Sequence, residues 1–386
     1  MKPNILVFCS WLFTDADTGD FFVEQSELVS DTYNMILVVF KKEYVSIKKL
    51  DHNKKSYIVE KRIHHNITVL EVYYPVHKKY PVWLQQYFKI KTVSLLHSYL
   101  TKNKIDVSLI HAQSIFDAGK WAYEYYLKYK IPYFITEHNQ LTFFNRDKKE
   151  AELVYQLLAG AKKICVVSND KARQFYANGL YFDYHNIGNL VHERFSYLEK
   201  KSNTVKRLIT IGGYHYLKDQ NTIIKALSDL DKELKTKIEF VWIGFDSWGG
   251  DFQKEINDII RTYDFKNIEF ILIPVLDRKG ILEYLRGSDA FVFSSLSEGM
   301  SVSVLEALAC GLPVFTSNCG GVDEIIDESN GCIYPIKDSA RLTTILKDFI
   351  SENKHYDSSQ ISKNIISRFG HEAFRTKLIK LYDELL

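Results

Sequence analysis

The chain has 386 residues, of which 46% are hydrophobic and 25% charged, with a net charge of +2. This length exceeds the usual size of one hydrophobic core and predicts two domains, while the ordinary globular composition excludes wholesale disorder. We expect no nucleic acid among the partners. Five scattered cysteines without a C-x-x-C pair favour reduced cytoplasmic thiols over a disulfide or zinc framework.

The N-terminal region begins with an apolar run, Ile5–Phe13. We interpret it as a first β-strand and not as a signal peptide, because acidic residues and no small-residue cleavage site follow it. No stretch reaches the roughly 18 uninterrupted apolar residues that span a bilayer. The sequence therefore predicts a protein that is soluble or peripheral to a membrane.

Basic residues are concentrated in the first half of the chain. Residues 1–190 hold 25 Lys and Arg against 19 Asp and Glu, and residues 41–104 hold 14 basic against 4 acidic side chains. Four aromatic residues are interleaved with these charges: Tyr80, Trp83, Tyr87 and Phe88. Such a region could face an anionic membrane surface or a phosphorylated acceptor, and the alternative is a solvated basic face.

Short apolar runs alternate with helical patterns along most of the chain. Runs without polar alternation indicate strands buried on both faces, hence parallel sheets flanked by helices. The predicted strands form two series: residues 5–8, 35–40, 107–110, 133–135 and 163–167, then 208–211, 240–243, 268–272 and 290–293. The sequence therefore predicts two α/β domains.

The domain boundary is predicted near residue 200. Residues 196–206 are mostly polar, with no helix or strand pattern of their own, which is typical of a linker. We assign residues 1–198 to the first domain and 199–386 to the second. The pattern after Pro335 is helical, and the last helices, about residues 365–386, could pack back on the first domain.

A helix with marked ends is predicted after the strand 290–293. Ser303 and Glu306 have the spacing of a capping box, Gly311 suits the left-handed conformation past the last turn, and Pro313 prevents continuation. The helix N-terminus then lies at the carboxyl ends of the strands, where open parallel sheets bind ligands. Amides of Gly299–Val302 and the helix dipole predict an anion site that suits a diphosphate.

Two glutamates flank this helix start. Glu298 lies in the preceding loop and Glu306 about one turn inside the helix, so their spacing does not make them one catalytic couple. A carboxylate can accept two hydrogen bonds from a vicinal diol, so one could hold donor-sugar hydroxyls and the other the nucleoside ribose. The alternatives are capping for Glu306 and a solvated loop acid for Glu298.

These residues belong to a longer ordered set. Glu298-Gly-Met-x5-Glu306-Ala-x-Ala-x-Gly311-x-Pro313 resembles the E-x7-E signature of the family 4 retaining glycosyltransferases. Similar segments occur upstream and downstream: Ile187–Phe195, Leu285–Ser295, Gly320–Ile326 and Gly331–Tyr334. The resemblance implies the GT-B fold, with two facing Rossmann-like domains and C-terminal helices.

In that family the first βα turn of the second domain reads Gly-Arg-Leu-x-x-x-Lys. Here it is Gly212-Gly213-Tyr214-His-Tyr-Leu-Lys218, so the lysine is kept and Gly213 stands where the family has arginine. The resemblance implies that Lys218 binds the donor diphosphate and stabilises the leaving group. His215 or another cation could compensate for the arginine, although His215 also fits an ordinary loop position.

The first domain is expected to contribute a histidine and a glycine loop. His138 follows the strand 133–135, resembles the family histidine at the reaction centre, and titrates near the operating pH; a structural histidine is the alternative. Gly19 occupies the place of the family's diphosphate loop, although an ordinary turn would also use glycine there. Asp15 and Asp17 form a D-x-D sequence that we assign to loop solvation, so no metal or cofactor is predicted.

The sequence therefore predicts a site with catalytic and donor-binding residues. His138, Lys218 and Glu298 are the catalytic candidates. The donor-binding candidates are Gly19, Lys218, Val275, Glu298, Gly299, Met300, Ser301, Val302 and Glu306.

The predicted activity is retaining transfer of a hexose-type sugar from a nucleotide-sugar, with UDP favoured over GDP. The expected acceptor is a glycan or lipid-linked glycan in cell-envelope polysaccharide synthesis, and the expected location is the cytoplasm, peripheral to the inner membrane face. A nucleotide-sugar 2-epimerase of the same fold and a non-catalytic sugar-nucleotide binding protein remain as alternatives. The absence of G-x-G-x-x-G disfavours NAD chemistry.

Overall fold

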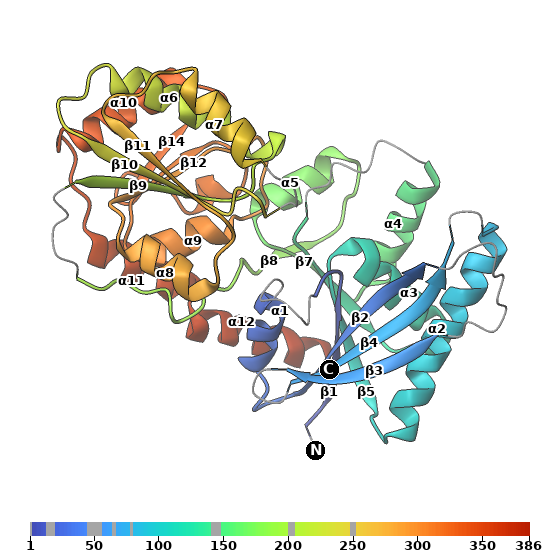
Figure 1. The fold of residues 1–386 in the computed structure, drawn as a ribbon. Coiled ribbons are helices and arrows are strands. Elements are labelled where there is room, and N and C mark those ends of the chain that lie inside the picture. The colour runs from blue at the N-terminus through green and yellow to red at the C-terminus, as the bar shows by residue number, and fades with distance from the viewer. Residues whose placement is uncertain are drawn as a thin grey trace. The chain divides into compact units, whose positions relative to one another are not determined.

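The computed structural model describes residues 2–12, 20–44, 56–63, 67–77, 80–139, 148–199, 205–247 and 252–386 (Figure 1). Asp15, Asp17 and Gly19, singled out in the sequence, lie outside the described residues. Backbone contacts divide the chain into two units. The first unit contains Met1–Val167, Ala172–Ile187 and Arg375–Leu386, and the second contains Ser168–Lys171 and Gly188–Phe374.

The described part of the first unit contains an eight-stranded sheet in the order β3-β4-β2-β1-β5-β6-β7-β8. Its strands are β1 (Asn4–Cys9), β2 (Asn34–Tyr44), β3 (Tyr57–Ile63), β4 (Ile67–Val76), β5 (Val107–Gln113), β6 (Tyr133–Glu137), β7 (Ile164–Val166) and β8 (Tyr184–Asn186). Only the β3–β4 pair in this described sheet is antiparallel. β3 was not predicted because its sequence is charged, as edge strands often are.

Helices cover both faces of this sheet (Figure 1). One face carries α2 (Val82–Lys102), α3 (Lys120–Tyr129) and α4 (Lys148–Gly160), and the core beneath them includes Phe8, Trp121 and Tyr125. The other face carries α1 (Asp20–Glu27) and the part of α12 (His371–Leu385) that belongs to this unit. The remaining elements are the π-helical turn η2 (Ile115–Gly119) and α5 (Asn169–Ala177).

The second unit is built on a parallel sheet, six-stranded in its described residues, in the order β11-β10-β9-β12-β13-β14. Its strands are β9 (Lys206–Ile211), β10 (Ile238–Ile243), β11 (Ile268–Ile273), β12 (Ala290–Phe293), β13 (Val314–Ser317) and β14 (Gly331–Tyr334). Figure 1 shows α6 (Gln220–Asp231), α7 (Gln253–Arg261) and α10 (Ser339–Ile350) on one face, and α8 (Arg278–Arg286), α9 (Val302–Ala309) and α11 (Ser358–Phe369) on the other. Short 3-10 turns are η3 (Tyr216–Lys218) and η4 (Val322–Glu324).

The predicted α/β class is confirmed in both units. Each predicted apolar run contains a strand of the parallel sheets, because residues buried on both faces of a sheet must be apolar. All five cysteines are free thiols, and four of them are buried.

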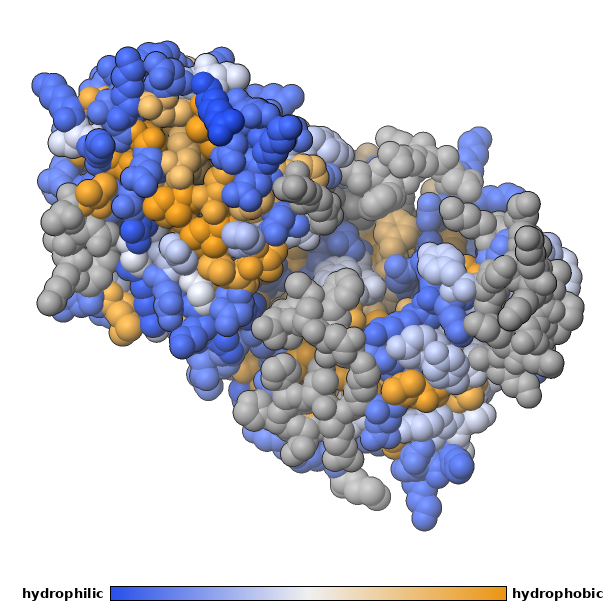
Figure 2. All heavy atoms as spheres, viewed as in Figure 1, coloured by the Kyte–Doolittle hydropathy of each residue, from blue (hydrophilic) through white to orange (hydrophobic). Residues whose placement is uncertain are grey.

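The exterior is mainly hydrophilic, with apolar side chains gathered on the visible face of the second unit (Figure 2). Among the described residues, no helix combines the length and the apolar character that crossing a membrane requires.

Candidate functional site

In the second unit, the loop between β12 and α9 is braced by the loop after β13. The backbone amide of Glu298 donates to the carbonyl oxygen of Cys319 at 2.6 Å. A side chain at Gly321, which has a φ of +66°, would overlap the carbonyl oxygen of Gly299. Glycine at position 321 therefore satisfies both a left-handed backbone and a close approach of two loops.

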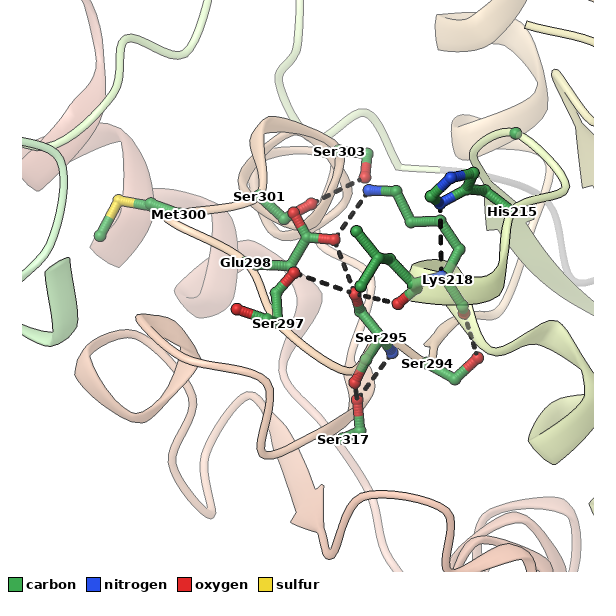
Figure 3. Close-up of polar contacts among 12 residues, drawn as sticks. His215, Lys218, Ser294, Ser295, Ser297, Glu298, Met300, Ser301, Ser303 and Ser317 are labelled. Atoms are coloured by element: carbon green, nitrogen blue, oxygen red, sulfur yellow. Dashed lines mark hydrogen bonds and ion pairs between the residues drawn. The ribbon is translucent and has the colours of Figure 1, made fainter. Parts of the chain in front are cut away.

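Lys218 and Glu298 meet at this loop (Figure 3). Lys218 Nζ lies 2.7 Å from Glu298 Oε1, and Ser295 Oγ donates to the same oxygen at 2.8 Å. The Lys218 side chain is 22% exposed and the Glu298 side chain 14% exposed. Ser294 Oγ donates to the Lys218 carbonyl oxygen at 2.9 Å, which fixes η3 against the end of β12. A cation and a carboxylate are thus held together at the carboxyl edge of the sheet.

Burial also determines the protonation state of the cysteine thiol beside this pair. Burial and, secondarily, the charge of Glu298 raise the pKa of Cys319 to about 12. Cys319 is therefore a neutral thiol near the pair and no candidate nucleophile.

The N-cap of helix α9 is Ser301, two residues before the Ser303 that the capping-box prediction used. The helix begins at Val302, Ser301 precedes it in an extended conformation, and no side chain of the described residues caps its first amides. Ser301 Oγ and Ser303 Oγ are 3.0 Å apart and hydrogen-bond each other. The amides at the helix start therefore remain suited to an anion.

The predicted role of Glu306 in a capping box is wrong. Its Oε1 accepts from Arg278 NH2 at 2.9 Å, and the Glu306 side chain is only 8% exposed. Because α9 begins at Val302, Glu306 is its fifth residue and lies past the first turn, so its side chain is not placed to cap the first amides. Asp277 Oδ1 caps α8 by accepting from the Gly280 amide at 2.7 Å, so Arg278 is the first residue of that helix.

Arg278 was not predicted from the sequence. Its guanidinium also lies over the ring of Phe195, 5.2 Å from the centroid. Burial, followed by the charges of Arg194 and Arg278, lowers the pKa of His192 to about 4. His192 is thus neutral at physiological pH. The N-cap Asp277 was the signal in the sequence that could have located Arg278 at a helix start.

The remaining donor-binding candidates differ in how far they are buried. Gly299, Met300 and Ser301 are buried and Val302 is half-buried. Met300 points away from the Lys218–Glu298 cluster (Figure 3), and its carbonyl oxygen accepts from Asn189 Nδ2 at 2.9 Å.

Val275 and Gly213 lie in other loops of this unit. Val275 is exposed, and its amide donates to Asp246 Oδ1 at 2.9 Å. The Gly213 carbonyl oxygen accepts from Gln220 Nε2 at 2.7 Å. His215, which could have replaced the family arginine, accepts a hydrogen bond from the Leu217 amide through Nδ1.

In the first unit, His138 immediately follows β6. Its Nε2 lies 2.7 Å from Gln113 Oε1, and Gln113 Nε2 donates to Gln25 Oε1 at 3.1 Å. This arrangement assigns a proton to Nε2 of His138. Gln25 and Gln113 are buried and were not predicted; polar residues within apolar elements were the available signal.

Aromatic rings surround His138. The centroids of Trp11, Phe21 and Phe22 lie 6.3, 5.2 and 6.0 Å from the His138 centroid, each at a steep angle. Such edges exclude water from one side of the imidazole and provide an apolar wall. This wall was also missed from the sequence.

Glu137 has a separate, structural set of partners. Its carboxylate is fully buried and accepts from Ser114 Oγ at 2.9 Å, the Ile115 amide at 2.7 Å and the Asn139 amide at 2.6 Å. Glu137 therefore ties the end of β6 to the turn η2. Within the described ranges, no group of three or more His, Cys, Asp or Glu residues could hold a metal ion.

Comparison with known proteins identifies relatives of both sequence and fold. Residues 194–366 match the family model described as Glycosyl transferases group 1. The N,N'-diacetylbacillosaminyl-diphospho-undecaprenol alpha-1,3-N-acetylgalactosaminyltransferase of Campylobacter jejuni is 33% identical over 173 residues, which are 42% of this chain and 42% of the relative. The chain thus spans less than half the length of this curated relative that it matches.

Two solved structures share the fold over almost the whole chain. Sucrose-phosphate synthase from Thermosynechococcus elongatus has a TM-score of 0.76 at 16% identity and covers 100% of this chain and 99% of its own. HepE of Anabaena in complex with UDP-glucose has a TM-score of 0.73 at 16% identity and covers 99% of each chain. The predicted fold class, GT-B with two Rossmann-like domains and C-terminal helices, is confirmed.

Proposed function

On the premise that this chain belongs to the group 1 glycosyltransferases, to which its residues 194–366 match, we propose that it transfers a sugar from a nucleotide-sugar donor with retention of configuration. The observation that carries the proposal is the Lys218–Glu298 pair beside the uncapped start of α9. A nucleoside diphosphate is a good leaving group, so helix amides and a lysine are sufficient to stabilise its departure. We favour a UDP-hexose because HepE of Anabaena, which shares the fold, has a structure with UDP-glucose.

The donor is bound by the second unit in this proposal. The amides of Gly299–Val302 and the ammonium of Lys218 hold the diphosphate, Glu298 holds donor-sugar hydroxyls, and Glu306 holds the ribose. Val275 contacts the base in this proposal.

Charge balance supports this assignment. Two carboxylates near a diphosphate would repel it unless each were neutralised. Glu298 is paired with Lys218 and Glu306 with Arg278. Arg278 therefore offers the second cation that Gly213 does not supply, and it acts through Glu306.

In the first unit, His138 forms a hydrogen bond with either the acceptor or the donor sugar. Its imidazole, oriented by the hydrogen bond between Nε2 and Gln113 Oε1, can form a hydrogen bond with a sugar hydroxyl. The surrounding aromatic edges keep this hydrogen bond away from water and thereby strengthen it.

We further propose a lipid-linked acceptor and contact with an anionic membrane face. Trp83, Tyr87 and Ile90 follow each other at helical spacing on α2 and are 70%, 49% and 43% exposed. This exposed apolar stripe next to Lys89 and Lys91 is typical of an interfacial helix. The Campylobacter jejuni relative is named for a diphospho-undecaprenol acceptor, which supports a lipid-linked substrate.

A thermal-shift panel of nucleoside diphosphates and their sugars tests the donor site. A ligand at 100 times its Kd adds about 2.7 kcal/mol to the free energy of unfolding. We expect one base to stand out and Glu306→Gln to weaken that stabilisation. Equal, background shifts with every nucleotide would overturn the donor assignment.

Product analysis separates transfer from its alternatives. A 2-epimerase would convert the nucleotide-sugar without any acceptor, and a non-catalytic binding protein would bind it but neither hydrolyse nor transfer it. We expect sugar transfer when a lipid-linked acceptor is added, with the anomeric configuration retained by NMR. Donor binding with neither hydrolysis nor transfer would favour the binding protein.

A further inference from the structure

The first unit contains a cavity of about 310 Å³ that the donor site does not use. It is lined by the carboxyl ends of β2 and β4, the start of α2, the turn η2 and the start of α3. Its walls are aromatic, with Tyr74, Tyr80, Phe88 and Trp121. Phe88 on α2 and Tyr80, which precedes the helix, thus line a cavity, whereas Trp83 and Tyr87 on α2 are exposed. The volume is at the lower end of the range for small-ligand pockets.

Asp117 is displayed at this cavity by a strained backbone. It has φ 59° and ψ −80° inside the π-helical turn η2, a conformation that costs about 1–3 kcal/mol for a residue with a side chain and tends to mark functional sites. The residue is exposed, and no hydrogen bond or ion pair reaches its carboxylate from the part of the chain that the structure describes. Burial, followed by the charge of Asp117, raises the pKa of the Tyr74 hydroxyl, which agrees with their proximity.

Three lysines line the same cavity, together with a second carboxylate, Glu124, which accepts a hydrogen bond from Gln86 Nε2 at 3.0 Å. One of these lysines, Lys120, pairs with Glu150 at 2.9 Å. Lys42 comes from β2 and Lys89 from α2, and neither forms an ion pair among the described residues. Ammonium groups bind a phosphate, and the aromatic wall beside them suits a group attached to that phosphate that is apolar on one face. A carboxylate beside them suits the hydroxyls of a sugar, because it accepts two hydrogen bonds from a diol.

The cavity is fixed relative to His138 through Glu137. Glu137, the last residue of β6, accepts hydrogen bonds from Ser114 and Ile115 at the start of η2. The hydrogen bonds of Glu137 therefore hold the segments that carry Asp117 and His138 in fixed positions. β2 and β6 are separated by β1 and β5, so they lie roughly 14 Å apart at the usual spacing of neighbouring strands. A group bound at Lys42 and Tyr74 is thus remote from a hydroxyl at His138.

We propose that this cavity is a distal acceptor subsite that binds a glycosyl phosphate, with Lys42 and Lys89 on the phosphate and Asp117 on the sugar hydroxyls. The inference rests on the proposed transferase function and deepens it. Helix α2 contributes both Lys89 to the cavity and the exposed stripe at Trp83, which places the phosphate end of an acceptor beside the proposed membrane face.

Binding is tested first, without any transfer reaction. N-acetylglucosamine 1-phosphate, N-acetylglucosamine and inorganic phosphate are titrated into the full chain and followed by NMR. We expect the sugar phosphate to bind at least about tenfold more tightly than either component. We also expect Lys42→Met/Lys89→Met and Asp117→Asn each to weaken binding severalfold or more. The matched control is Lys91→Met, a neighbouring lysine on α2 that lies outside the cavity.

Sugar-phosphate affinity that is equal in the double variant and in Lys91→Met overturns the subsite. A farnesyl diphosphate-linked N-acetylglucosamine that binds through the same residues identifies a lipid-linked source, and binding of the soluble sugar phosphate alone identifies a soluble one.

Steady-state kinetics then distinguish a failure of the proposed subsite from a failure of the proposed transferase activity. With a lipid-linked acceptor, the double variant should raise the acceptor KM about tenfold while UDP affinity and donor hydrolysis stay unchanged. An unchanged acceptor KM overturns the subsite and leaves the transferase intact. Failure of the wild-type chain to transfer sugar overturns the proposed function, while the NMR titration still reports on the cavity.

Discussion

Replacing Lys218 by Met tests the donor site most directly. In the structure without ligand, Lys218 Nζ donates to Glu298 Oε1 at 2.7 Å, and both side chains are largely buried. The change removes the ammonium, which also lies 5.4 Å from the centroid of the Phe293 ring, while keeping most of the aliphatic stem. Glu298 keeps its hydrogen bond from Ser295, so the loop should hold its conformation.

The expected loss of affinity follows from one charge-assisted hydrogen bond. A hydrogen bond to a charged group contributes about 1.5–3 kcal/mol, and in the bound state Lys218 would donate to the diphosphate. A loss of about 2 kcal/mol weakens UDP binding roughly 30-fold. Uridine lacks the diphosphate, so its affinity should change by less than about twofold. Stability should fall by only about 1 kcal/mol, since both side chains of the pair retain some contact with solvent.

Calorimetric titration with UDP and uridine measures these differences. The matched control is Lys347→Met in the same unit, because Lys347 pairs with Glu233 on an exposed surface away from α9. The reasoning is refuted if Lys218→Met and Lys347→Met bind UDP equally well. It is also refuted if the Lys218 variant loses uridine and UDP affinity to the same extent, since that result would indicate a distorted loop.

Three other changes test the first unit. Gln113→Glu places a carboxylate on Nε2 of His138 and should move the acid limb of the pH–kcat profile upward by about 1 unit, while Gln113→Leu should lower kcat without that shift. Burial lowers the pKa of His111 well below its usual value, so the unfolded state alone takes up the proton below about pH 6.5. Stability should then fall by up to about 1.4 kcal/mol per pH unit as the pH drops, and His111→Gln should reduce this slope in urea titrations. Trp83→Ser combined with Tyr87→Ser should cut sedimentation with anionic vesicles about tenfold, and unchanged partitioning would remove the membrane proposal.

The fold could be predicted from the sequence to the extent that burial determines it. Strands such as β1 and β10 are covered by helices on both faces, and their apolar runs therefore identified them. β3, which pairs antiparallel with β4, lies at the edge of its sheet, where charged side chains are tolerated and the apolar signal is lost.

The candidate site could be predicted where its residues form a local motif or carry the family resemblance, as Lys218 does 80 positions before Glu298. The loop at Glu298 and the start of α9 form a local motif. By contrast, the pairing of Arg278 with Glu306 joins α8 to α9, and the capping box that local spacing predicted does not form because α9 begins at Val302. The partnership of Gln113 with His138 likewise joins the ends of two neighbouring strands, a relation that appears only once the sheet is formed.

Gly213 shows how one substitution can change the electrostatic design of the donor site. An arginine there would bring a cation directly to the diphosphate, and Glu306 would then need no partner of its own to keep the site from repelling an anion. With glycine at 213, we expect Arg278, whose guanidinium lies against Glu306 and the Phe195 ring, to supply positive charge to the proposed donor site. A cation held in this way lowers the repulsion felt by the diphosphate without having to contact it. We therefore expect donor affinity to depend on Arg278 because it neutralises Glu306, and on Lys218 because it contacts the diphosphate directly.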